Sequence, residues 1–299
     1  MPEVQDVHVD RWLTNLSVAY SNGQYIAEDL LPPVAVRNLS DAFVIYGREK
    51  FRVPQTLRAP HTEAAEAGWS LSQDTYSCRE YALKDYIDDL ERQNADQPLN
   101  LEQDTVENLT DILRLDQELR VKDLIGTLDA VSAPTTKWDA DGADPVDDVM
   151  AATRTFVENC GLAPNVAVVP WQVLAALKTN AAILDRIKYT QRGVVTADLL
   201  ASVFEVDRVL VPSARYNTAA EGAEENMAWV WDDTVVLAYV TSRPGLRQVS
   251  LGYIFRARNW TVRRWREEAR HSDAFEVSVV QDEKIVCSVA GLRIPDVLT

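Results

Sequence analysis

The segment from Asn100 to Leu128 constrains the fold most, because it is the one long stretch with the pattern of an amphipathic helix. Asn100 is a good N-terminal capping residue, and Gln103 follows three residues later, where its side chain can reach back to Asn100. Gly126 and the Ser-Ala-Pro run after it indicate where the helix ends. The sequence therefore predicts one long, capped helix.

The two faces of this helix differ. At about 100° per residue, one narrow stripe is charged and about half of the surface is apolar. Charge pairs one turn apart contribute only a few tenths of a kcal/mol each, so we expect packing against another element to hold the helix. The charged stripe comprises Asp104, Glu107, Asp111, Arg114, Glu118 and Lys122, and the apolar face comprises Val106, Leu109, Ile112, Leu113, Leu115 and Leu119.

Composition excludes several classes of protein. A chain of 299 residues with 46% hydrophobic residues can build a large core, as one elaborate domain or two modest ones. A net charge of -16 argues against a basic face that grips nucleic acid, although an acidic protein can still enclose DNA. Cys78, Cys160 and Cys287 form no C-x-x-C pair, which favours a reducing, cytoplasmic site of synthesis over a disulfide framework or zinc site. Neither a signal peptide nor an apolar run of about 18 residues is present.

Residues 1–42 have the pattern of an extended arm, because Asn22-Gly23 and Pro32-Pro33 interrupt any helix and apolar residues come in short clusters. Such an arm has no core of its own. It is either a frayed terminus or a segment that packs on another subunit, and we favour the second interpretation.

Residues 43–88 contain two short β-like pieces, a polar loop and a longer β-like stretch from Trp69 to Ile87. We interpret them as a two-stranded excursion rather than as part of the core sheet. A lone ribbon is marginally stable in water, so we expect it to lie on another subunit.

The acidic run from Trp138 to Asp148 does not match a calcium-binding loop, because its glycine and glutamate positions are wrong. Asp144 before Pro145 instead predicts a helix start, and Gly161 predicts the end of that helix after Cys160.

The second half of the chain reads as an α/β section followed by a β-rich third. A hairpin is expected about Asp232-Asp233, and a turn at Gln281 to Lys284 within the last strands. The α/β section should comprise a strand at 165–170, helices at 171–180, 181–189 and 196–204, and a strand at 209–211, with a loop at 216–226.

No catalytic, cofactor or metal site is predicted. Gly68 to Ser72 lacks the last glycine of a serine-hydrolase elbow, and no phosphate-binding glycine motif occurs. His8, His61 and His271 lie in unrelated polar contexts that are typical of surface histidines. A hydrolase that uses scattered Asp and His residues of the α/β section remains the rival from another class.

One basic, aromatic cluster lies in the last third of the chain. It could be a platform for stacking nucleic-acid bases, or a strand whose arginines pair with acidic neighbours such as Glu267 and Glu268. We favour the second interpretation, given the surplus of acid. The cluster comprises Arg256, Arg258, Arg263, Arg264 and Arg266, with Trp260 and Trp265.

Four segments resemble tailed-bacteriophage major capsid proteins, in the same order over most of the chain: WDADGADPVDD, the run from Asn180 to Asn217, SRPGLRQVSLGYIF and VRRWREE. The resemblance implies the α+β capsid fold named after phage Hong Kong ninety-seven. It implies an N-terminal arm at 1–42, an extended loop at 43–88, a peripheral domain with a spine helix at 89–149, an axial domain at 150–250 and returning peripheral strands at 251–299.

The implied function is a shell protein that assembles into hexamers and pentamers around double-stranded DNA in the host bacterial cytoplasm, with portal, scaffolding or decoration proteins as further partners. The alternative within the fold is an encapsulin-like compartment. A scaffold would be a separate or removed segment, and we expect no covalent link through Lys50 or Lys84. Side chains expected at subunit interfaces are Trp12, Tyr20, Tyr25, Lys50, Phe51, Trp69, Tyr76, Arg79, Arg263, Arg264, Trp265 and Arg266.

Overall fold

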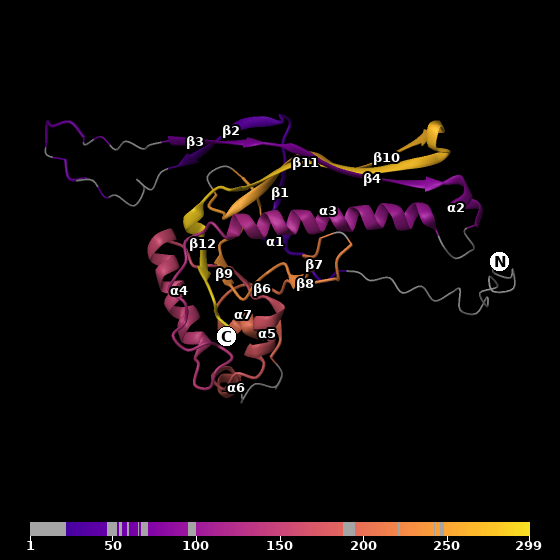
Figure 1. The fold of residues 1–299 in the computed structure, drawn as a ribbon. Coiled ribbons are helices and arrows are strands. Elements are labelled where there is room, and N and C mark those ends of the chain that lie inside the picture. Colours follow the sequence, from indigo (N-terminus) through magenta and orange to yellow (C-terminus); the bar gives the residue numbers. More distant parts are fainter. Residues whose placement is uncertain are drawn as a thin grey trace.

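Helices and sheets both contribute to the fold, so the α+β class is confirmed. The upper part in Figure 1 is a sheet with one long helix along its face, and the lower part is a smaller sheet surrounded by short helices. The computed structural model describes residues 22–46, 53, 56–58, 60–64, 66, 71–94, 100–187, 195–220, 222–241, 243–245 and 248–299.

The upper sheet has the strand order β1-β10-β11-β4. Its two long strands are antiparallel, with β-bulges near Arg258, and β1 joins one edge in parallel. The long helix α3 contacts β11 and β4, so its apolar face is covered by this sheet (Figure 1). The bounds are β1 Pro33–Ala35, β4 Arg79–Asp88, α3 Leu101–Ile125, β10 Gly252–Glu267 and β11 Ser272–Ile285; α2 Asp89–Asn94 follows β4, and the 3-10 turn η3 Glu268–Arg270 joins β10 to β11.

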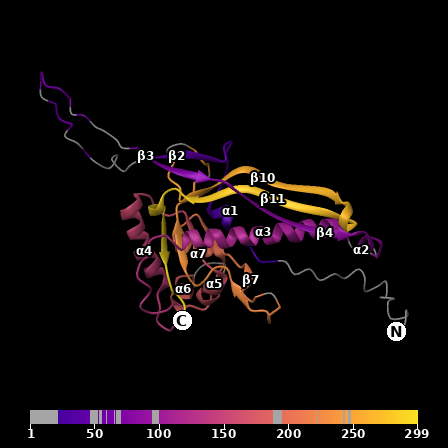
Figure 2. The same ribbon diagram turned by 45° about the horizontal axis from the view of Figure 1, so that its top comes forward.

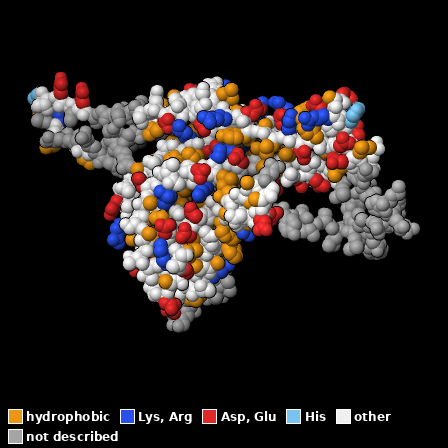
Figure 3. All heavy atoms as spheres, viewed as in Figure 1, with side chains coloured by type: hydrophobic (Ala, Val, Ile, Leu, Met, Phe, Trp, Pro, Cys, Tyr) orange, Lys and Arg blue, Asp and Glu red, His pale blue; other side chains and the backbone are white. Residues whose placement is uncertain are grey.

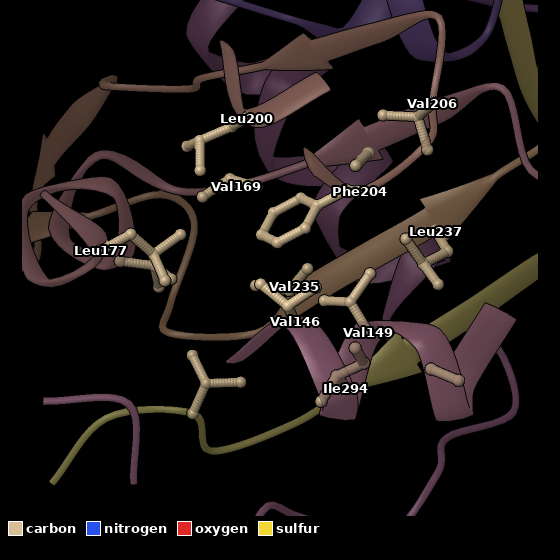
Figure 4. Packing of buried hydrophobic residues seen from close by; sticks show 14 of the residues in the cluster. Val146, Val149, Val169, Leu177, Leu200, Phe204, Val206, Val235, Leu237 and Ile294 are labelled. Carbon is tan, nitrogen blue, oxygen red and sulfur yellow. The ribbon is translucent and has the colours of Figure 1, made fainter. Parts of the chain in front are cut away.

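The lower sheet has the strand order β12-β9-β5-β6. Its strands are short and apolar, because both faces are covered: every residue of Val166–Val168 and Val235–Ala238 is buried. Leu177 and Leu200 from the helices, with Phe204 directly after a helix, pack against Val235 and Leu237 on one face (Figure 4). The bounds are α4 Pro145–Cys160, β5 Val166–Val168, α5 Trp171–Leu177, α6 Ala181–Ile187, α7 Ala197–Val203, β6 Arg208–Leu210, β9 Val235–Ala238, η4 Ser288–Ala290 and β12 Gly291–Ile294.

Two small antiparallel pairs lie outside these sheets. The hairpin strands β2 and β3 pair from Ser40↔Ser77 to Tyr46↔Leu71, and Figure 2 shows them leading away from the body of the molecule. The pair β7 and β8 lies below the long helix (Figure 1). The bounds are β2 Ser40–Tyr46, β3 Leu71–Ser77, β7 Arg215–Asn217 and β8 Met227–Trp229, and the short helix α1 Ala27–Leu30 precedes β1.

Helix starts were predicted well from capping residues. The Asn100 side chain accepts a hydrogen bond from the Gln103 amide at 3.4 Å. Asp144 caps α4 through the amides of Val146 and Asp147 at 3.1 and 3.3 Å, and Gly161 ends that helix in the left-handed conformation at φ 76°. These predictions are confirmed because a cap acts within one turn of its own helix.

The expected faces of the long helix are wrong at two positions. Ile112, placed on the apolar face, is 46% exposed, whereas Glu118, placed on the charged stripe, is 0% exposed. Glu118 is buried because a second layer of the molecule covers this side of α3 towards its C-terminal end. That layer includes α1 and Trp231.

The hairpin expected about Asp232-Asp233 and the turn expected at Gln281 to Lys284 are both wrong. β8 pairs with β7, while β9 pairs with β5 and β12, so the two strands beside Asp232 never meet. β11 runs without a break through Ile285, which pairs with Gly252. Residues 216 and 217, expected in a loop, belong to β7.

The expected ribbon and arm are also corrected in part. Arg79–Asp88 is a full strand of the upper sheet, so only β2 and β3 form a separate ribbon. Ile26, Leu30 and Leu31 of the expected arm are each 0% exposed within their own chain. The strand β12, expected to return to the peripheral sheet, pairs with β9 in the lower sheet instead.

Candidate functional site

The residues expected at subunit interfaces do not form one cluster. Tyr25 lies beside α3, Tyr76 and Arg79 lie at the root of the hairpin, and the arginine-rich run lies towards the opposite end of the upper sheet. Trp12, Tyr20, Lys50, Phe51 and Trp69 lie outside the described residues.

The root of the hairpin is fixed by stacked aromatic rings. Tyr76 is 7% exposed and stacks on Phe255 of β10 with ring centroids 4.6 Å apart. Phe43 of β2 stacks on the same ring at 5.4 Å. Stacked aromatic pairs add about 1 kcal/mol each beyond their buried area, so the base of the hairpin is tied firmly to its own sheet. Tyr76 is thus a core residue of its own chain.

Polar contacts continue this attachment. The Ser77 amide donates to Asp282 of β11 at 2.8 Å, and Lys284 lies 3.5 Å from Asp74 of β3. Arg79, which is exposed, lines a groove of about 390 Å³ beside Tyr81. No ion pair joins Arg79 to another described residue. Of the residues predicted at the hairpin root, Arg79 therefore remains available to another molecule.

Beyond its root the hairpin leaves its own body (Figures 1 and 2). Among the described residues of this part, Val53 is 88% exposed and Leu57 is 85% exposed. Glu63 and Glu66 are exposed as well. Apolar side chains at such exposure mark a surface that gains stability when a partner covers it.

Tyr25 begins the segment that joins the arm to α3. Its hydroxyl donates to the Asp111 carbonyl at 3.5 Å, and Ile26 and Ala27 follow at the start of α1. The Glu118 carboxylate accepts the Ile26 amide at 3.1 Å, the Ala27 amide at 2.9 Å and the Trp231 indole N–H at 2.7 Å. One buried carboxylate therefore joins three parts of the chain that are distant in sequence.

Burial raises the pKa of the Glu118 carboxyl above its ordinary value, and the hydrogen bonds from Trp231, Ile26 and Ala27 oppose that shift without cancelling it. A negative charge in this place is disfavoured by lost hydration. The carboxylate nevertheless has donors on both oxygens, so removing it would leave buried N–H groups without a partner.

A second buried polar network crosses the upper part. Arg120 of α3 donates to both oxygens of Glu283 at 2.8 and 3.2 Å, and its guanidinium lies 3.7 Å from the centroid of the Tyr81 ring. Gln281 donates to Glu283 at 2.8 Å and accepts from Arg256 at 3.1 Å. Arg256 then pairs with Glu28 of α1 at 2.6 Å. These contacts link the helix, the sheet and α1.

The arginine-rich run pairs with acidic residues of the same chain, as the favoured interpretation predicted. Arg264 contacts Asp273 at 2.8 Å and Glu102 at 3.0 Å, and Arg266 contacts Asp89 at 2.6 Å. The hydrogen bond from Arg266 lowers the pKa of Asp89. Most of these acids lie on other elements, and of the expected neighbours Glu268 lies 3.9 Å from Arg266.

Arg263 and Trp265 complete the run. Arg263 is the most exposed of its arginines, with 52% of its side chain accessible, and lies 3.6 Å from Glu276. The Trp265 indole N–H donates to Glu267 at 3.4 Å. Arg258 pairs with Glu80, so every arginine of the cluster has an acidic partner. This pairing leaves little free positive charge for nucleic acid.

The sequence interpretation missed one aromatic surface on the lower part. Trp171, the first residue of α5, stacks on Trp229 of β8 with centroids 5.6 Å apart, and the Arg215 guanidinium lies 5.1 Å from the Trp229 centroid. Trp171 is 49% exposed and Met227 is 44% exposed. Figure 3 shows hydrophobic side chains gathered over this side of the lower part. Single tryptophans in a short helix and a short strand gave no signal that they would meet.

The described part of the chain contains no group of three or more His, Cys, Asp or Glu residues arranged to hold a metal ion. None of its helices is both long enough and apolar enough to span a membrane. His61 and His271 occupy left-handed backbone conformations at φ 66° and 49° in separate turns.

Comparison with known proteins gives a consistent result. The chain is 31% identical over 262 residues to the major capsid protein of Burkholderia phage BcepMu, covering 83% of each protein. A phage-related protein from Bordetella bronchiseptica has a similar fold, with a TM-score of 0.72, 24% identity and 93% and 94% of the two chains covered. The capsid protein of cyanophage P-SCSP1u gives a TM-score of 0.67 at 11% identity, over 97% and 93% of the two chains. No family model matches the chain.

Proposed function

Because the chain belongs to the family of phage major capsid proteins, we propose that copies of it form hexameric and pentameric rings that close into an icosahedral head shell around double-stranded DNA. No catalytic activity is part of this function. Its place is the virion capsid, and assembly is proposed to occur in the cytoplasm of the host bacterium.

One observation carries the proposal, namely the hairpin that leaves its own body. A segment with Val53 and Leu57 more than four-fifths exposed gains little stability from its own chain beyond the root. Its root is nevertheless held by Tyr76 and Phe43 on Phe255. A firmly held root with an uncovered end fits a segment that reaches a neighbouring copy.

Each part of the chain is also assigned a role in the shell, following the family to which the chain belongs. Residues 1–42 are proposed as the arm, 43–88 as the extended loop and α3 as the spine of the peripheral domain, with 150–250 as the axial domain and 251–299 as returning strands. Two observations adjust these bounds: β4 belongs to the upper sheet, and residues from β12 onwards belong with the lower part.

The charge of the chain suits a container for DNA. At a net charge of -16, phosphate groups are not pinned by clusters of Lys and Arg, and the arginines of the upper sheet are already paired. Packed DNA is therefore expected to bind the inner surface of the shell weakly, so that it moves along this surface and is released from it. Portal, scaffolding and decoration proteins are proposed as further partners.

The encapsulin-like compartment is not favoured, because the relative with 31% identity is named as a phage major capsid protein. The two functions also differ in content: a head holds DNA, whereas a compartment holds a protein cargo.

Electron microscopy of the purified protein tests the proposal. Expressed alone or with its neighbouring genes, the protein is expected to sediment as closed particles with hexameric and pentameric units. In particles made during phage growth, DNA should resist nuclease. A protein that stays monomeric under all assembling conditions would contradict the proposed function.

A further inference from the structure

Two surfaces on the lower part carry large apolar side chains that its described residues leave exposed. The tryptophan platform consists of Trp171, Arg215, Met227 and Trp229. The α4 face consists of Met150, Arg154, Val157 and Glu158 with Leu162 just after the helix. Figures 1 and 2 are related by a turn about the horizontal axis, and both place α4 on the left flank and β7 on the right flank. The two surfaces therefore lie on opposite flanks of the same part.

The α4 face is the exposed, partly apolar side of this helix. Met150 and Val157 are 38% and 41% exposed and lie on one side of the helix, seven residues apart, and Leu162, after the end of the helix, is 37% exposed. The opposite side of α4 is buried in the lower core through Val149 and Phe156. The helix thus has one apolar face inside the molecule and a second, mixed face outside.

The tryptophan platform has the residue composition of a binding hot spot. Tryptophan and arginine are the residue types that most often dominate protein interfaces, and a stacked pair is already ordered before it binds. The Arg215 guanidinium donates to the Met227 carbonyl at 3.0 Å, which holds it in place over Trp229. No described carboxylate forms an ion pair with it.

The charges of the two surfaces match. Glu158 is exposed between Val157 and Leu162, and no described cation pairs with it. Arg154 lies one turn earlier on the same face and is also exposed. A guanidinium among aromatic rings on one flank and a carboxylate among aliphatic side chains on the other are complementary, whereas two copies of the tryptophan platform would place Arg215 against Arg215.

Ring formation explains why the partner is another copy of this chain. In a ring each copy meets its two neighbours through two different surfaces on opposite sides, so both surfaces must exist on one molecule. We propose that the tryptophan platform of one copy binds the α4 face of the next, with Arg215 beside Glu158, and that this contact holds the rings together. The inference rests on the proposed function.

A charge swap tests the pairing. Arg215→Glu alone and Glu158→Arg alone should each lower the yield of particles at least about tenfold, which corresponds to about 1.4 kcal/mol. The double variant with both changes should restore most of that yield. The control is Arg215→Glu with Asp141→Arg, because Asp141 is exposed outside both surfaces and the double control has the same net charge. The control is expected to remain defective.

Trp171→Ala is a second test of the same contact, and it changes no charge. It should reduce particle yield at least as much, while circular dichroism and thermal unfolding of the unassembled subunit stay close to those of wild type. If Arg215→Glu fails to fold, Glu158→Arg and Trp171→Ala decide the question. Two outcomes would overturn this inference alone, provided that the wild type forms particles. One is a full yield of particles from these variants, and the other is a charge swap that fails to restore the yield. Absence of wild-type particles would instead overturn the proposed function.

Discussion

The helix α1 and the hairpin β2–β3 were both expected to bury their apolar residues on a neighbouring subunit, yet they differ. Ile26, Leu30 and Leu31 are 0% exposed within their own chain, while Val53 and Leu57 of the hairpin are 88% and 85% exposed. The difference lies in polar attachment, since Glu118 accepts the Ala27 amide and Arg256 pairs with Glu28, which holds the start of α1 to the body. A segment is kept on its own subunit when its backbone donors find partners there.

The largest effect is expected from removing the end of the hairpin loop, where Glu63 and Glu66 are exposed. Deletion of Ala59 to Gly68 should abolish closed particles, because the surface that reaches a neighbour is lost. The subunit should still fold, with its thermal midpoint within a few degrees of wild type, since the root on Phe255 is untouched.

A matched control replaces the same residues with a Gly-Ser segment of equal length. It keeps the reach of the loop and removes only its side chains. Electron microscopy and sedimentation measure particle formation. Normal particles from the deletion variant would show that the hairpin, like α1, does not need a neighbouring copy.

An intermediate effect is expected from breaking the attachment of α1. Glu118→Ala should lower the free energy of unfolding by about 3 kcal/mol, because it leaves the buried N–H groups of Ile26, Ala27 and Trp231 without an acceptor. Chemical denaturation of the unassembled subunit measures this change.

Glu107→Ala is the control for that variant, because Glu107 is exposed on the same helix. Its effect should stay within about 0.5 kcal/mol. Equal losses from the two variants would show that Glu118 does not hold α1 in place.

The smallest effect is expected from pH. The pKa of Glu118 is raised above 4.5 in the folded chain, so the folded state binds the proton more tightly than the unfolded state. Its contribution is therefore fully present below pH 4.5 and is lost as the pH rises through the folded pKa. The stability advantage of wild type over Glu118→Gln should shrink as the pH is raised from 4 to 7, as measured by unfolding at each pH. An advantage that grows with pH would reverse the assigned direction.

What the sequence predicted correctly depends on local contacts. The caps at Asn100 and Asp144 act within one helical turn, so the residues beside each cap determine it. The arginine pairing was also foreseeable, because a surplus of acid makes a nearby carboxylate common. The encounter of Tyr76 with Phe255 was not foreseeable, since the two residues are brought together only by the pairing of distant strands.

The wrong predictions concern segments whose structure is decided by contacts with residues distant in sequence. Asp232 does shape a local turn by accepting the Thr234 amide at 3.1 Å, but the strands on its two sides pair with distant partners. The sequence pattern predicts a turn at Gln281 to Lys284, yet Gln281 and Glu283 are buried in the network with Arg120. Polar residues indicate solvent only where no distant partner is available.

The order of strands in the lower sheet has a consequence for synthesis. β5, β6 and β9 are made first, but β12 completes this sheet only after β10 and β11 have been made for the upper one. Pairing across such a gap in sequence is slow, and an incomplete sheet edge invites wrong partners. The growing chain therefore has the last strand of its lower sheet available only after every strand of its upper sheet has been made.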